Sequence, residues 1–180
     1  MGLRYENLDI ETRRHMLKEI EFDAQNETFY LSSYLSQAGQ GEWQEVLVEA
    51  VCSGNDDTMA QALRQRGRLN EFAYRRTPSG GHTQYRVPAT APETLAEGEF
   101  NRYYVRGLCR RAIAESIRKL EVYRAKDGEA VRPEWMERIG LLMEPETFLI
   151  DVRLSIGIEP ALGIPQGPSS GLTLRIPHRS

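Results

Sequence analysis

Residues 90–117 read TAPETLAEGEFNRYYVRGLCRRAIAESI, the longest stretch of the chain with helical periodicity. Thr90 and Glu93 form a capping-box pattern, with Pro92 inside the first turn, so the spacing predicts a helix from about Glu93 to about Ile117. Its expected inner stripe is apolar and follows helical spacing: Leu95, Phe100, Tyr104, Leu108 and Ala112.

Shorter elements are predicted on both sides of this helix. Asp9 is a good N-cap for a first helix over residues 10–22, Gly54 ends a second helix that begins near Trp43, and Asp56 caps a third. A β-hairpin is expected at about 72–87, with Pro78 and a Gly-Gly pair in its turn. A strand is expected at 119–124, and further helices from 133 and over 145–154. The fold class is therefore mainly α (α+β), a small helical bundle with a β-hairpin.

The last 26 residues differ from the rest in composition. Residues 155–180 contain four Gly, four Pro and four Ser, a density that excludes a helix. We therefore expect a helical domain over 1–154 and an extended docking arm over 155–180. The segment LTLRI (172–176) alternates in the way that suits a strand added to the sheet edge of a partner. The expected partner-binding residues are the apolar anchors of this arm: Leu162, Ile164, Leu172, Leu174 and Ile176.

The overall composition is that of an ordinary globular protein. The chain has 180 residues, of which 40% are hydrophobic and 27% charged. No apolar run approaches the length of a membrane span, and the first residues do not resemble a signal peptide. We therefore expect a soluble protein that is cytoplasmic during expression and makes no membrane contact.

Common catalytic and metal-binding motifs are absent from the sequence. It contains no P-loop, GxSxG or HExxH pattern, so no catalytic residue and no cofactor are assigned. The two cysteines and three histidines are scattered singly, so no metal site is expected. A less favoured alternative is an enzyme whose nucleophile is Cys109, because Arg106, Arg110 and Arg111 lie nearby and could lower the pKa of its thiol.

Charge is distributed unevenly along the chain. The net charge of −3 divides into −8 over residues 1–60, +7 over 61–125 and −2 over 126–180. Such a division favours contact between copies or with a polyanion. Two groups of residues within the basic segment stand out, one at the hairpin and one at positions i, i+4 and i+8 of the long helix. Each group is a candidate for binding nucleic acid or an acidic protein surface. The alternative for each is an ordinary solvated face. The hairpin group is Arg75, Arg76, His82 and Arg86, and the helix group is Arg102, Arg106 and Arg110.

Two segments carry a resemblance to known proteins. LAEGEFNRYYVRGLCRRAIAE (95–115) and GIPQGPSSGLTLRI (163–176) resemble uncharacterised structural proteins of tailed phages and prophages. The expected architecture is also similar to that of head–tail adaptor proteins, in which a small helical domain sends an extended arm onto a neighbouring ring. The hairpin and the strand at 119–124 depart from the more purely helical adaptors. The resemblance implies a neck or capsid-associated protein of a virion.

These observations lead to two functional hypotheses. The first is a structural or assembly protein that binds protein partners, including copies of itself, through the C-terminal arm. The alternative is a nucleic-acid-binding accessory protein that uses the basic hairpin and the arginine-lined helix. Binding through phosphates would depend steeply on salt, whereas apolar docking would not, so the two hypotheses are separable.

Overall fold

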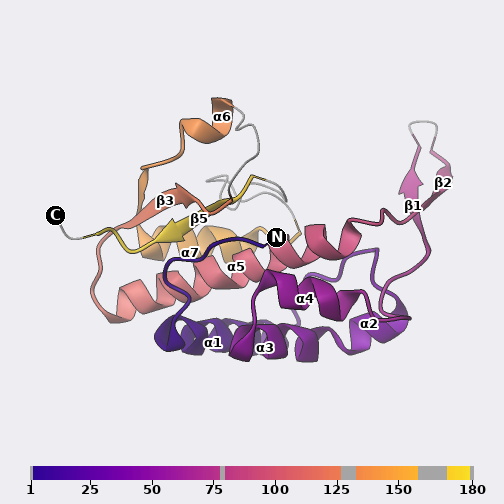
Figure 1. Ribbon diagram of the computed structural model, residues 1–180, viewed down its shortest axis with the longest axis horizontal. Helices are drawn as coiled ribbons and strands as arrows, with labels where there is room; N and C mark the ends of the chain where they lie inside the picture. The colour runs from indigo at the N-terminus through magenta and orange to yellow at the C-terminus, as the bar shows by residue number, and fades with distance from the viewer. Residues whose placement is uncertain (1, 78–79, 127–132, 158–169, 179–180) are drawn as a thin grey trace.

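A computed structural model describes residues 2–77, 80–126, 133–157 and 170–178, and these residues form helices and two small sheets (Figure 1). This arrangement confirms the predicted mainly α (α+β) fold class. None of the helices in these ranges combines the length and the apolar character needed to cross a bilayer. The elements in chain order are α1 (Ile10–Asn26), α2 (Gln37–Gly41), α3 (Trp43–Ser53), α4 (Asp56–Leu63), β1 (Phe72–Arg76), β2 (His82–Arg86), α5 (Ala91–Ala114), β3 (Leu120–Arg124), α6 (Pro133–Met136), β4 (Leu142–Met143), α7 (Pro145–Leu154) and β5 (Leu172–Arg175).

Helix α5 runs through the middle of the molecule. It packs against α1 and α4 on one side and against α7 and β5 on the other (Figure 1). Every residue from Glu99 to Cys109 is buried, so the helix has no solvent face over this stretch. A helix buried all round is the core of a fold rather than part of its surface. The predicted apolar stripe is buried as expected, and polar residues on the other faces of α5 are buried as well.

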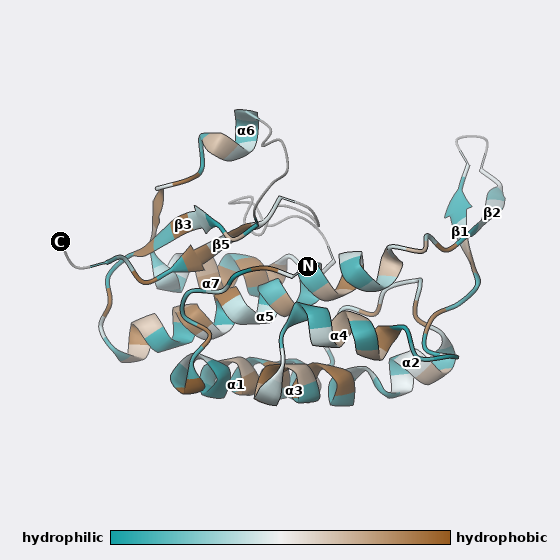
Figure 2. Cartoon of the chain, in the orientation of Figure 1, coloured by the Kyte–Doolittle hydropathy of each residue, from teal (hydrophilic) through white to brown (hydrophobic). Residues whose placement is uncertain are grey.

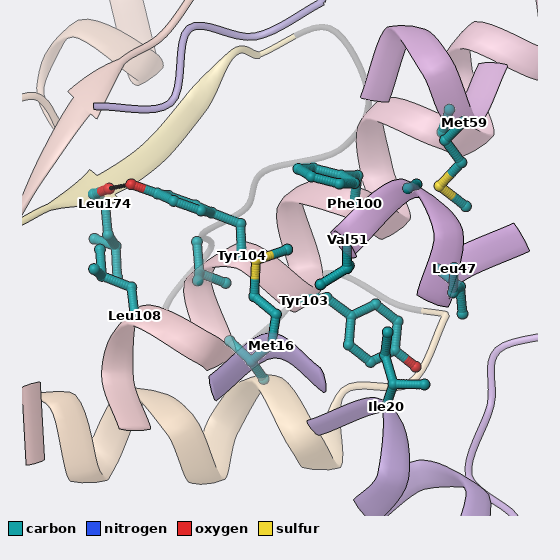
Figure 3. Close-up of a cluster of buried hydrophobic side chains, with 14 of the residues drawn as sticks. Met16, Ile20, Leu47, Val51, Met59, Phe100, Tyr103, Tyr104, Leu108 and Leu174 are labelled. Atoms are coloured by element: carbon teal, nitrogen blue, oxygen red, sulfur yellow. Dashed lines mark hydrogen bonds between the residues drawn. The ribbon is translucent and has the colours of Figure 1, made fainter. Parts of the chain in front are cut away.

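The close approach of α1 to α5 depends on Gly107. A Cβ atom at this position would lie 2.5 Å from Cγ of Met16 and 2.8 Å from its backbone nitrogen. Only glycine therefore lets the two helices lie this near each other without a shift of the α1 backbone. Around this crossing, Met16 and Ile20 pack with Tyr103, Tyr104 and other apolar side chains in the main core (Figure 3).

Helix capping agrees with the prediction at the start of α1 and differs at the start of α5. Asp9 caps α1, and its carboxylate accepts a hydrogen bond from the backbone N–H of Thr12 at 3.0 Å. Thr90 makes no side-chain cap, so the predicted capping box with Glu93 was wrong. The ψ angle of Thr90 is 2°, whereas an N-cap side chain normally reaches its partner from an extended backbone.

Helix α4, and not α5, begins with a capping box. The side chain of Asn55 accepts from the N–H of Thr58, and the Thr58 hydroxyl oxygen accepts from the N–H of Asn55. Asp56 is therefore the first residue of the helix and not its cap. Its carboxylate accepts a hydrogen bond from the N–H of Leu3 at 2.9 Å and ties the N-terminal segment to α4.

Both predicted β regions form antiparallel sheets. Strands β1 and β2 pair as a hairpin in register from Phe72 with Arg86 to Arg76 with His82. Pro78 of the predicted turn lies outside the described residues. The second sheet has the order β4-β3-β5 and lies against the side of α5 opposite α1 (Figure 1).

Strand β5 corrects the prediction of a docking arm. It pairs with β3 of its own chain, and Leu172 and Leu174 are fully buried in the main core. Its outer edge is covered by α5, because the Asn101 amide donates to the carbonyl of Leu172 at 2.8 Å and the Tyr104 hydroxyl donates to the carbonyl of Leu174 at 3.1 Å (Figure 3). These two leucines therefore complete the fold and are not free to bind a partner.

Of the other three predicted anchors of the arm, one packs on the core and two lie outside the described residues. Ile176 is half-buried and packs on the same core, and its N–H donates to the side chain of Asn7 at 2.8 Å. Leu162 and Ile164 lie outside the described residues. Alternation along 172–176 correctly indicated a strand, but it contains no information about which chain supplies the neighbouring strand.

Because β5 packs into the core, truncating the Leu174 side chain is expected to destabilise the fold strongly. Leu174→Ala should lower the free energy of unfolding by about 2–5 kcal/mol, because it leaves a cavity in the core. Leu154→Ala is the matched control, since Leu154 is 77% exposed, and it should change stability by less than about 0.5 kcal/mol. Urea denaturation followed by circular dichroism measures both variants. Equal effects of the two substitutions would mean that β5 does not belong to the core.

Candidate functional site

The two arginine groups predicted from the sequence lie in opposite environments. In the α5 group, Arg102 and Arg106 are buried and Arg110 is partly buried, whereas the arginines of the hairpin face solvent. This difference decides which group is available for binding.

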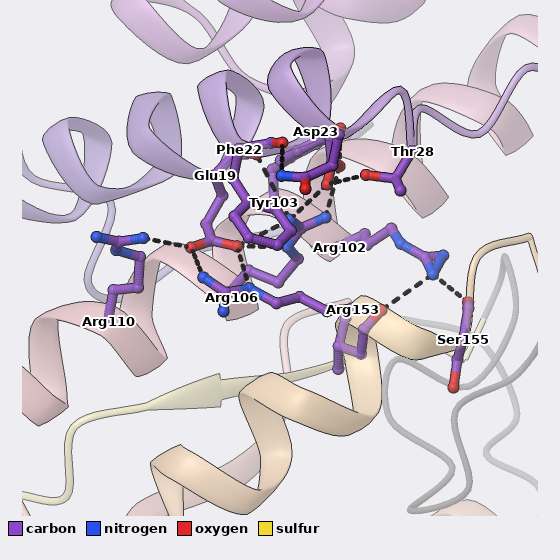
Figure 4. Close-up of polar contacts among 12 residues, drawn as sticks. Glu19, Phe22, Asp23, Thr28, Arg102, Tyr103, Arg106, Arg110, Arg153 and Ser155 are labelled. Atoms are coloured by element: carbon purple, nitrogen blue, oxygen red, sulfur yellow. Dashed lines mark hydrogen bonds and ion pairs between the residues drawn. The ribbon is translucent and has the colours of Figure 1, made fainter.

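Arg106 is the centre of a buried charged network between α1 and α5 (Figure 4). Its guanidinium donates to the Glu19 carboxylate at 2.8 Å and to both oxygens of Asp23 at 2.7 and 2.8 Å. Asp23 also accepts from the hydroxyls of Tyr103 at 2.6 Å and Thr28 at 2.9 Å. The bidentate geometry and the extra hydrogen bonds are what a buried ion pair needs to offset the loss of water.

Glu19 joins this network to α7. Its carboxylate accepts from Arg110 at 3.0 Å and twice from Arg153, at 2.9 and 2.6 Å. Burial alone would raise the pKa of Glu19, but the hydrogen bonds and charges of Arg153 and Arg106 outweigh it, so that the pKa lies below its usual value. One ionised carboxylate therefore connects three helices.

Arg102 completes the inward set and ties α5 to the end of α7. Its guanidinium donates to the carbonyls of Val152, at 3.1 Å, and Ser155 (Figure 4). The prediction that Arg102, Arg106 and Arg110 form a binding face was therefore wrong. Carboxylates of α1 and carbonyls of α7 satisfy these arginines, because helical spacing defines a face but not what covers it.

Cys109 lies in the same interior and does not fit the role of a nucleophile. It is fully buried, and burial raises the pKa of its thiol well above the usual value, with the Glu19 charge adding to the effect. Arg106 and Arg110, which were expected to lower this pKa, bind Glu19 instead. A reactive cysteine needs an accessible thiolate, so the structure contradicts this interpretation.

Glu99 is a buried acid of α5 whose carboxylate is not fully paired. Its Oε2 atom is buried without a hydrogen-bond partner in the described structure. Burial raises the pKa of Glu99 to about 7, although Arg102 and Arg106 act in the opposite direction. Within the described ranges, no three His, Cys, Asp or Glu residues are grouped so that they could hold a metal ion.

The hairpin presents one face entirely to solvent. Cross-strand partners point to the same side of an antiparallel pair, so the register places Phe72, Tyr74 and Arg76 on this face. Their partners on β2 are Arg86, Gln84 and His82, and all six residues are exposed. Tyr74 is 65% exposed, and its hydroxyl accepts a hydrogen bond from Gln84 at 3.2 Å. We call these six residues the hairpin face.

The opposite side of the hairpin holds it to the body. Ala73 is buried, and the Tyr85 ring lies edge-on to Tyr34 with centroids 6.5 Å apart. Arg75 lies over the Tyr85 ring, with its guanidinium carbon 5.9 Å from the ring centroid. The base of the hairpin is therefore anchored while its arms project from the helical layer, largely in hydrophilic colours in Figure 2.

The arginines of the hairpin have few acidic partners among the described residues. Arg86 approaches Glu71 at 3.5 Å in a pair open to solvent, which contributes little. Among the described residues no acid pairs with Arg75 or Arg76. The structure thus places the four predicted residues of the hairpin group on one exposed ribbon, with Arg76, His82 and Arg86 on the hairpin face and Arg75 on the opposite side. The neighbouring Phe72 and Tyr74 were not assigned to the site from sequence; their alternation with arginines was the available signal.

The burial of Glu99 predicts that removing its charge by substitution stabilises the folded state at high pH and not at low pH. The folded state retains the Glu99 proton that the unfolded state loses above its ordinary pKa of 4.5, so wild-type stability falls as pH rises from about 4.5 to 7. Glu99→Gln should therefore be about 1–3 kcal/mol more stable than wild type at pH 8 and similar to it at pH 4. The exposed Glu137→Gln is the control. Urea denaturation at both pH values measures this, and a pH-independent difference would contradict the shifted ionisation.

Comparison with known proteins does not assign this chain to a family. No family model, no curated protein and no solved structure matches it.

Proposed function

We propose that this protein functions in assembly and that it binds a protein partner through the hairpin face. The observation that carries the proposal is the exposure of Phe72 and Tyr74 beside Arg76 and Arg86 on a projecting ribbon. Aromatic and arginine side chains contribute most of the binding energy at protein interfaces. No other described element of the chain covers these side chains.

The anchored base of the hairpin supports this role. Tyr85 packs on Tyr34 and Ala73 is buried, so the ribbon is held before a partner arrives. A preordered element loses less conformational entropy on binding than a flexible one does. The hairpin thus takes over the contact function that was expected of the C-terminal strand.

The setting of this assembly rests on the sequence resemblance alone. Residues 95–115 and 163–176 resemble structural proteins of tailed phages, and on that basis we propose a neck or capsid-associated component of a virion. The partners in such a particle would be proteins, including other copies of this chain.

Nucleic acid is the second candidate partner. Arg75, Arg76, Arg86 and His82 lie on one two-stranded ribbon, an element that can enter a nucleic-acid groove. The support is weaker than the sequence suggested, because Arg102 and Arg106 of α5 are bound inside the molecule.

The nucleic-acid candidate predicts binding to a DNA duplex. The logarithm of the binding constant should fall with the logarithm of the salt concentration with a slope no steeper than about −3 to −4, from about four neutralised phosphates. Fluorescence anisotropy of a labelled duplex at several salt concentrations measures it; binding unchanged in Arg75→Glu/Arg76→Glu would exclude the hairpin as the contact.

Site-specific photocrosslinking in the producing cell tests the protein-binding proposal. A photoreactive phenylalanine analogue at Tyr74 should give a discrete protein adduct, because this side chain lies on the hairpin face. The same analogue at Ile10, which is also highly exposed, is the control and should give no such adduct. Gel electrophoresis with nuclease treatment, followed by mass spectrometry, reads out both. An adduct lost on nuclease treatment, or equal labelling from the two positions, would overturn the proposal.

A further inference from the structure

Four acidic side chains on the outer surface of α1 and α3 remain without cationic partners. Glu45 and Glu49 lie one turn apart on the solvent side of α3, and Glu21 and Glu27 are exposed at and just beyond the second half of α1. Among the described residues none of these four carboxylates forms an ion pair. We call the four residues the acidic face.

The packing of the two helices places these acids at the same end. Arg13, in the first half of α1, donates to the carbonyls of Val51 at 2.6 Å and Gly54 at 2.9 Å at the end of α3. The two helices therefore run antiparallel, side by side (Figure 1). The second half of α1, with Glu21, consequently lies beside the first half of α3, with Glu45.

Most of the other acids in the first 60 residues are already used within the chain. Glu19 and Asp23 bind Arg106 in the core, Asp9 binds Arg111 at 2.6 Å and Glu42 binds Arg68 at 2.7 Å. The division of charge seen in the sequence is thus largely satisfied by intramolecular pairs. The acidic face and the hairpin residues Arg75 and Arg76 are among the exposed charges that form no ion pair within the described part of the chain.

These two remaining surfaces cannot meet within one molecule. The hairpin rises from one end of the helical layer and points away from α1 and α3 (Figure 1). Its base is fixed by the packing of Tyr85 on Tyr34. A contact between Arg75 or Arg76 and the acidic face therefore requires a second molecule.

We propose that the partner of the hairpin is a second copy of this chain, which receives it on the acidic face. This inference rests on the proposed function and identifies its partner. Complementary charge is the argument. Arg76 on the hairpin face and Arg75 on the opposite side of the ribbon have no acidic partner among the described residues, and the carboxylates of Glu45 and Glu49 have no cationic one. A net charge of −3 disfavours a polyanion by comparison.

The contact has a defined symmetry. One copy contributes its hairpin and the next contributes its acidic face, so the interface is heterologous and each copy retains one free surface of each kind. Such contacts produce a ring where the rotation closes and a filament where it does not. A variant that lacks one surface can therefore still take part in a single contact.

Sedimentation velocity of the purified, nuclease-treated protein tests this arrangement through two complementary variants. Arg75→Ser/Arg76→Ser removes the two hairpin arginines that lack an acidic partner among the described residues, and Glu45→Gln/Glu49→Gln removes acids from the receiving face. Wild type should form species larger than a dimer at high protein concentration, and salt should weaken them. Each variant alone should be monomeric. Mixed in equal amounts the two variants should form a dimer, because one intact hairpin can meet one intact acidic face.

The control variant is Glu137→Gln/Glu146→Gln. It changes two exposed acids outside the acidic face and should assemble like wild type. Circular dichroism checks that every variant is folded. Monomeric wild type, assembly of either variant alone, or failure of the mixture to dimerise would overturn the inference. The photocrosslink from Tyr74 to a different protein would in that case leave the proposed function standing, whereas an adduct between copies supports both.

Discussion

The buried guanidinium of Arg106 organises this molecule. It lies between Glu19 and Asp23 of α1, and through Glu19 it is connected to Arg153 of α7. Removing one member of a buried ionic group costs about 3–5 kcal/mol, because the others are left charged and without water. The network therefore fixes α1 and α7 against α5 in one arrangement, and the apolar core forms around that arrangement.

This network also determines which charges are available outside. Opposite charges from distant parts of the chain neutralise each other in the interior, so Arg106 is buried and Arg110 is partly covered. The cations that remain exposed on the hairpin lie beside Phe72 and Tyr74. A patch of charge together with aromatic area favours specific protein contact more than general attraction to a polyanion. The surface chemistry of the molecule thus follows from the pairing in its core.

The same helix controls the edge of the second sheet. Asn101 and Tyr104 donate to carbonyls on the outer side of β5, groups that would otherwise be free to pair with a strand from another molecule. The hydroxyl of Thr173 donates back to Asn101 at 2.6 Å. Polar residues of a buried helix therefore close this side of the sheet to a strand from another molecule.

Local features of the sequence by themselves determined the class of fold and most of its elements. The cap at Asp9, the end of α3 at Gly54, the apolar stripe of α5 and the strand at 172–175 depend on neighbours a few residues apart, and such patterns are readable from sequence. The partners of charged and strand-forming residues depend on contacts between segments far apart in the chain. Arg106 meets Glu19, and β5 meets β3, only after the helices have packed. Tertiary structure alone therefore decided that Arg102 and Arg106 are buried, that the C-terminal strand belongs to its own core, and that the hairpin face is exposed.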